Sequence, residues 1–130
     1  MLVIDASVAL PACTSPDGFS FFGDEPLVAT PLLWSEARSA LHEALWRREI
    51  STEEARTALD ILEGAPIRPR SHRRLGINAW QLADGLGWAK TYDAEYLALA
   101  RLLRCQLVTL DARLHRGAAR LGFVITPGDL

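Results

Sequence analysis

Four acidic residues occupy positions where a carboxylate needs an explanation: the ends of two apolar runs, the apolar face of one predicted helix and the head of another. This acidic quartet consists of Asp5, Glu36, Asp93 and Asp111. An unpaired carboxylate on a buried face is costly to desolvate, and carboxylates that converge repel one another unless a cation lies between them. Oxygen ligands suit hard cations such as Mg²⁺ or Mn²⁺. The pattern therefore favours a shared divalent cation.

Each member of the quartet also has an ordinary structural explanation. Asp5 and Asp111 can cap the helices that follow them, which is the more frequent role of a lone aspartate at the end of a strand. Asp93 suits the first turn of an apolar helix, where a negative charge is stabilising. Glu36 can pair with an arginine, such as Arg38 or one from another helix. Both interpretations stay open for all four residues.

Short apolar runs predict the strands of a buried sheet. They are 2–4, 106–110, 123–126 and, more weakly, 26–30. Segments of helical period are found at 30–49, 51–64, 71–88, 93–104 and 111–122. Strands that alternate with helices indicate an α/β fold with three α/β/α layers around a mostly parallel sheet. Its length makes 1–130 a single predicted domain.

Local signals define some of the element ends. Thr30 is a good N-cap before Pro31, and Ser51 with Glu54 forms a predicted capping box. We expect a long loop at 64–70, "GAPIRPR", and a short bridging segment at 17–23. Ligands of parallel sheets bind at the carboxyl ends of the strands, which is where Asp5 and Asp111 are predicted to lie.

Composition excludes several classes of protein. The net charge is −2, so the overall charge does not indicate a nucleic-acid binder. Cys13 and Cys105 match no zinc or redox spacing, and His42, His72 and His115 have no metal-ligand spacing and are predicted on the surface. No apolar run predicts a membrane helix, and the N-terminus does not read as a signal peptide. We therefore expect a cytoplasmic protein.

Four segments together resemble the motifs of a known family. "LVIDASV", "PLLWSEARSAL", "TYDAEYLALA" and "LVTLDARL" are similar to the four motifs of the PIN domain, and more narrowly to VapC-type toxins. The resemblance runs from residue 2 to about residue 126. It implies a PIN-like fold and a metal-dependent endoribonuclease whose acidic positions are the quartet. Three of them, Asp5, Glu36 and Asp93, would hold the main Mg²⁺ or Mn²⁺, and Asp111 a second ion or a ligating water.

Small hydroxyl residues stand two positions from two of the acids. Ser7 follows Asp5, and Thr109 precedes Asp111. The resemblance implies that these hydroxyls support the metal site. Hydrogen bonds to the local backbone would explain them equally well.

RNA would need basic contacts, and arginines cluster in "RPRSHRR" at 68–74 and after the last acid. The candidates are Arg68, Arg70, Arg73, Arg74, Arg113 and Arg116. Such side chains can hold phosphates, although a solvated surface would carry them too.

The resemblance further implies a homodimer and a cognate VapB-type antitoxin, with an exposed apolar groove near the helices that begin at Thr30 and Ser51. The four tryptophans exceed the needs of a small core, so some are predicted to face a partner.

Other functions remain as alternatives. One is a PIN nuclease of RNA processing outside a toxin–antitoxin pair, and another is a PIN fold kept only for binding. A Mg²⁺-binding receiver-like signalling domain would need an acidic pair near Asp5 and a late lysine, whereas Lys90 is the only lysine. A dehalogenase-type phosphatase would need a second aspartate where Ser7 stands.

Overall fold

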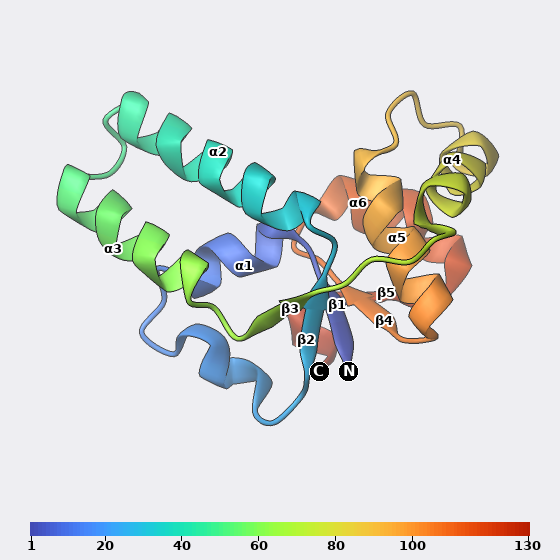
Figure 1. Ribbon diagram of the computed structural model, residues 1–130, viewed down its shortest axis with the longest axis horizontal. Coiled ribbons are helices and arrows are strands. Elements are labelled where there is room, and N and C mark those ends of the chain that lie inside the picture. Colours follow the sequence, from blue (N-terminus) through green and yellow to red (C-terminus); the bar gives the residue numbers. More distant parts are fainter.

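The short apolar runs form a sheet in which every pairing is parallel. The computed structural model describes residues 1–130, and its five strands lie in the order β3-β2-β1-β4-β5 (Figure 1). Their bounds are β1 Leu2–Ile4, β2 Leu27–Ala29, β3 Ile67–Pro69, β4 Gln106–Val108 and β5 Val124–Ile125. Paired strands are parallel throughout. Because β1 is central, the residue that follows it lies in the middle of the carboxyl edge of the sheet.

Six α-helices connect and flank these strands, which confirms the predicted α/β fold. Their bounds are α1 Ala6–Ala12, α2 Leu32–Trp46, α3 Thr52–Glu63, α4 Leu75–Leu86, α5 Tyr92–Leu103 and α6 Ala112–Ala118. Short 3-10 turns lie at Gly18–Phe22, Ala119–Leu121 and Pro127–Asp129. Helices α2 and α3 run side by side as an arm, whereas α4, α5 and α6 gather beyond the other side of the sheet (Figure 1). None of these helices has the length and apolar character that crossing a membrane requires.

Two local predictions were wrong. The predicted loop at 64–70 contains β3, the edge strand of the sheet. Only Ile67 of this strand is buried, and Pro69 is tolerated because an edge strand has one unpaired side, so the segment has no apolar alternation to reveal it. The N-cap of α2 is Pro31 rather than Thr30, whose hydroxyl makes no capping bond.

Helix α5 forms the centre of the core. From Tyr96 to Ala100 every side chain is buried, and the helix contacts both β1 and β4 as well as α4. Its first turn, with Asp93, reaches the carboxyl edge of the sheet. Helix α5 is rich in apolar residues because most of its surface is buried. Asp93, in its first turn, lies at the edge of that core.

The capping box of α3 is present as predicted. The Ser51 hydroxyl accepts a hydrogen bond from the Glu54 N–H, and the Glu54 carboxylate accepts one from the Ser51 N–H, both at 3.1 Å. Two of the N–H groups that a helix start leaves free are thereby satisfied.

We predict that Ser51→Ala lowers the free energy of unfolding by about 1 kcal/mol, because one capping acceptor is lost. Thermal denaturation should show a midpoint lower by about 4 °C. Thr52→Ala is the matched control, since the exposed Thr52 side chain makes no hydrogen bond. Equal thermal midpoints for the two variants would show that the capping box adds nothing to the stability of the fold.

Candidate active site

The carboxylate of Asp5 is buried directly after β1. The residue is 5% exposed, and its Oδ1 accepts the Val8 N–H at 3.2 Å, which caps α1. The Ser7 hydroxyl donates to Oδ1 and the Thr109 hydroxyl donates to Oδ2, each at 2.5 Å. Three donors therefore hold this carboxylate in one orientation.

The two hydroxyls that hold Asp5 also bond the loop after β4. Ser7 Oγ accepts the Leu110 N–H at 2.9 Å, and Thr109 Oγ1 accepts the Asp111 N–H at 3.0 Å. The hydrogen bond to local backbone is present for Thr109, whereas the backbone partner of Ser7 lies 103 positions away along the chain. Their role toward a metal stays a prediction.

Burial is the main influence on the Asp5 carboxyl and raises its pKa above the ordinary value, because the charged form is desolvated. The hydrogen bonds from Ser7, Thr109 and Val8 act in the opposite direction, and the nearby charge of Asp93 adds to the increase in pKa.

Glu36 lies half-buried on α2 and is held by a residue of α5. The Tyr96 hydroxyl donates to Glu36 Oε1 at 2.5 Å. Arg38, the partner considered from the sequence, instead forms an exposed ion pair with Glu63 at 2.7 Å. Burial raises the pKa of Glu36, the bond from Tyr96 lowers it, and the charges of Asp93 and Asp5 raise it further. Burial also raises the pKa of Tyr96, so the phenol stays protonated as a donor.

Asp93 stands in the first turn of α5 with part of its side chain exposed. Its carboxylate accepts no hydrogen bond from the protein, so it makes no side-chain cap. Partial desolvation is the largest influence on its pKa and raises it. The neighbouring charge of Asp111 raises the pKa further, and that of Arg113 lowers it. Asp93 therefore contributes a charge with both oxygens available for a ligand.

Asp111 is the N-cap of α6. Its Oδ1 accepts the N–H groups of Arg113 at 2.8 Å and Leu114 at 3.2 Å. Its capping role is thus real, and its other oxygen has no protein donor. Asp111 and Asp93 line one pocket, together with the loop 87–90 and Arg113.

The carboxyl edge of the sheet thus gathers the whole quartet. Asp5, Glu36 and Asp93 are close enough for their charges to interact, and Asp111 interacts with Asp93. No three acidic, histidine or cysteine side chains come near enough to form a closed metal-binding group. The available donors are carboxylate and hydroxyl oxygens, a set that fits a hard cation and not a thiophilic one.

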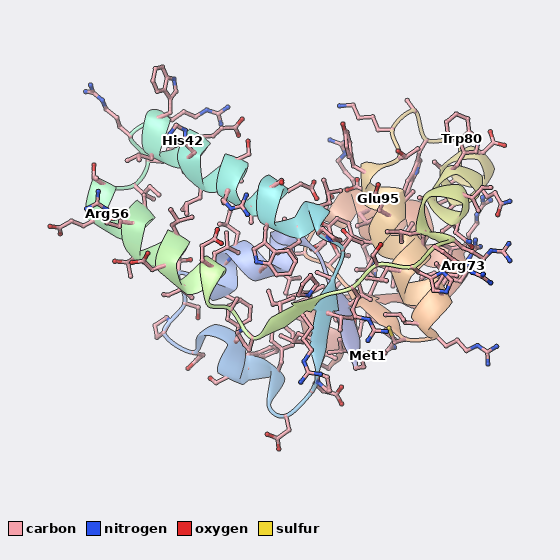
Figure 2. The ribbon with its side chains drawn as sticks, in the orientation of Figure 1. Met1, His42, Arg56, Arg73, Trp80 and Glu95 are labelled. Carbon is pink, nitrogen blue, oxygen red and sulfur yellow. The ribbon has the colours of Figure 1, made fainter.

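Sequence reasoning missed Tyr96 and Glu95. Tyr96 is buried among apolar residues of α5, and its hydroxyl bonds Glu36. Glu95 lies on the same helix (Figure 2), and its charge raises the pKa of Glu36. A tyrosine within a run of leucine and alanine was the only available signal, because its hydroxyl needs a buried partner.

The six candidate RNA-binding arginines are all exposed, and none forms an ion pair. Arg113 alone reaches the pocket of Asp93 and Asp111. Arg73 lies by α4, on the opposite side of the molecule from the α2–α3 arm that carries Arg56 (Figure 2). Their contact with RNA stays a prediction.

A groove between α2 and α3 matches the predicted apolar one. It is lined by the leucines Leu41, Leu45 and Leu59 and by the basic residues Arg38, His42 and Arg56, among others. His42 and Arg56 can be followed on the two helices of the arm (Figure 2).

Trp34 and Trp88 pack partly against the core, whereas Trp46 and Trp80 are 81% and 68% exposed. That the exposed ones face a partner stays a prediction. His42 and His72 are exposed as predicted, and His115 is half-buried on α6.

Comparison with known proteins gives consistent results. Residues 2–120 match the model of the PIN domain family. Ribonuclease VapC9 of Mycobacterium tuberculosis and VapC ribonuclease Mb0985 of Mycobacterium bovis are each 32% identical to this chain over 130 residues, which cover 98% of this chain and 99% of theirs. Ribonuclease VapC1 of Mycobacterium tuberculosis is 41% identical over 87 residues, 66% of this chain and 63% of its own length.

A solved structure supports the fold. The crystal structure of PAE2754 from Pyrobaculum aerophilum superimposes with a TM-score of 0.75 at 23% identity, covering 98% of this chain and 90% of that one. Taken with the family match over most of the chain, these similarities show that the chain belongs to the PIN domain family, among the VapC ribonucleases.

Proposed function

We propose that this chain is a metal-dependent endoribonuclease that hydrolyses RNA phosphodiester bonds and acts as the toxin of a VapBC-type pair. The observation that carries the proposal is the gathering of Asp5, Glu36 and Asp93 at the carboxyl edge of a parallel sheet, where the charge of Asp93 raises the pKa of both Asp5 and Glu36. Similarity to VapC ribonucleases over nearly the whole chain favours the toxin over a PIN nuclease of RNA processing.

The residues suited to hold Mg²⁺ or Mn²⁺ are Asp5, Glu36 and Asp93. Asp111 would hold a second ion or a water bound to the first. When bound, a divalent cation lowers the pKa of a ligating water and polarises a phosphoryl oxygen. The protein's own contribution is orientation. Ser7 and Thr109 fix the plane of the Asp5 carboxylate, Tyr96 fixes Glu36, and Asp93 keeps both oxygens free.

The metal site can be tested with Asp93→Asn, which keeps the size of the side chain and removes one charge. We expect a higher thermal midpoint without metal, because repulsion within the quartet falls. Added Mg²⁺ should then stabilise the variant much less than the wild type. RNA cleavage should fall at least about 100-fold, since even groups that only support metal ligands commonly cost 10- to 100-fold.

Asp60→Asn on α3 is the matched control, since this exposed aspartate lies outside the quartet. Full cleavage by Asp93→Asn, with unchanged stabilisation by Mg²⁺, would show that Asp93 takes no part in a metal site.

For RNA binding we propose that the arginines by α4 hold backbone phosphates. A double variant, Arg73→Gln with Arg74→Gln, should raise KM several-fold at about 0.15 M salt with little change in kcat. The slope of log KM against log salt concentration should fall by about 2, because each contact between an arginine and a phosphate contributes about 1 to that slope. Arg47→Gln with Arg56→Gln is the control on the other side of the molecule. Identical salt slopes in the two double variants would show that Arg73 and Arg74 do not contact the RNA.

For partners we propose a homodimer and a cognate VapB-type antitoxin whose apolar segment occupies the α2–α3 groove. Leu59 lines the groove and Ile61 does not, yet both lie on α3 and are similarly exposed, at 37% and 41%. Leu59→Glu should abolish co-purification with the small protein encoded beside this gene, because a buried charge would face leucines. Ile61→Glu should retain it.

RNA cleavage by the isolated Leu59→Glu protein should stay at the wild-type level. Equal co-purification by both variants would place the antitoxin elsewhere. Light scattering of the wild type at micromolar concentration should give a dimer, and a strict monomer would contradict that part of the proposal.

A further inference from the structure

Thr30 is a buried polar residue that the site as described does not use. It follows β2 directly, has no exposed surface, and its Oγ1 is the only buried side-chain nitrogen or oxygen without a hydrogen-bond partner. Leaving a buried hydroxyl unpaired costs about 1–3 kcal/mol. Such a group in a native protein calls for a specific explanation.

The strand register places Thr30 beside Asp5. Strands β1 and β2 pair with Val3 opposite Val28. Counting on by two residues at the same register sets Asp5 opposite Thr30, each one position beyond the end of its strand. Because side chains alternate along a strand, the same register would put those two residues on the face of the sheet that carries Val3 and Val28.

The other side of β1 supports this reading of the register. Ile4 pairs with Val108 of β4, so the next position brings Asp5 opposite Thr109. There the expected contact is present, as the Thr109 hydroxyl donates to Asp5 Oδ2 at 2.5 Å. Asp5 is therefore flanked by a threonine on each neighbouring strand, and only one of the two hydroxyls has a protein partner.

The backbone around Thr30 holds it in place. The Arg70 N–H donates to the Ala29 carbonyl at 2.8 Å, which continues the ladder past β2, and the Leu33 N–H donates to the Thr30 carbonyl at 3.1 Å, which begins α2. A β-branched side chain is also restricted in rotation. A capping role does not account for the hydroxyl, since it makes no capping bond.

We propose that the Thr30 hydroxyl is a positioning group of the same site, where it hydrogen-bonds an oxygen held beside Asp5. That oxygen belongs either to a water on the divalent cation or to the phosphate of the RNA. The inference rests on the proposed nuclease function. It adds a polar group from β2 to the acids and to the hydroxyls of α1 and β4.

The test compares Thr30→Val, which removes only the hydroxyl, with Thr30→Ser, which keeps it. Thr57→Val, on the exposed surface of α3, is the control for the exchange itself. Each protein is measured in two ways: the shift of the thermal midpoint with Mn²⁺ alone, and kcat and KM for single-stranded RNA with Mn²⁺.

We expect Thr30→Val to be at least as stable as the wild type without metal, because an unpaired buried hydroxyl is gone. Its kcat should fall at least about 10-fold, as for other groups that support a metal site. Thr30→Ser should retain most of the wild-type kcat. A reduced Mn²⁺ shift in Thr30→Val assigns the oxygen to a metal-bound water, and an unchanged shift with lower kcat or higher KM assigns it to the RNA phosphate.

Wild-type behaviour of Thr30→Val in both measurements would overturn the inference. A loss of equal size in Thr30→Ser would also overturn it, since side-chain volume would then be the cause. If Thr30→Val does not fold, Thr30→Ala removes the same hydroxyl, and failure of both to fold would show that the hydroxyl serves the fold instead. If the wild type itself shows neither Mn²⁺ stabilisation nor cleavage, the nuclease proposal fails first.

Discussion

A buried carboxylate on the central strand constrains the surrounding structure. Asp5 lies where β1 gives way to α1, and three donors from α1 and the end of β4 hold its two oxygens. Those same hydroxyls fix the loop that leads into α6. A charge can stay buried only with such partners, so the hydrogen bonds around Asp5 determine how β1, β4 and the two helices meet.

Two further helices bring their acids to that edge by different means. Helix α5 is buried along most of its length, which fixes the position of Asp93 at its exposed first turn. Helix α2 packs against α1 and α3, and the Tyr96 hydroxyl holds its Glu36 side chain at the site. The apolar packing of α5 thus supplies rigidity to both acids. Binding sites built on packed helices and strands hold their geometry better than sites built on loops.

Local patterns predicted much of this arrangement, and tertiary contacts account for what they missed. The capping box at Ser51 and the central strands have signals within a few residues. The edge strand β3 lacks one, because only Ile67 is buried. The partner of Glu36 could not be chosen from sequence, since Tyr96 lies 60 positions away and Arg38 is closer in the chain. Likewise, Thr30 has the sequence of a helix cap, but in the fold its hydroxyl is buried and makes no capping bond.

The central claim is that Asp5, Glu36 and Asp93 share a divalent cation. Anomalous diffraction from crystals soaked in Mn²⁺, recorded at the manganese edge, tests it most directly. We predict a single strong peak bounded by carboxylate oxygens of those three residues, with Asp111 nearest to any second peak. The absence of a peak among them at saturating Mn²⁺, or a strong peak confined to another part of the surface, would contradict the account.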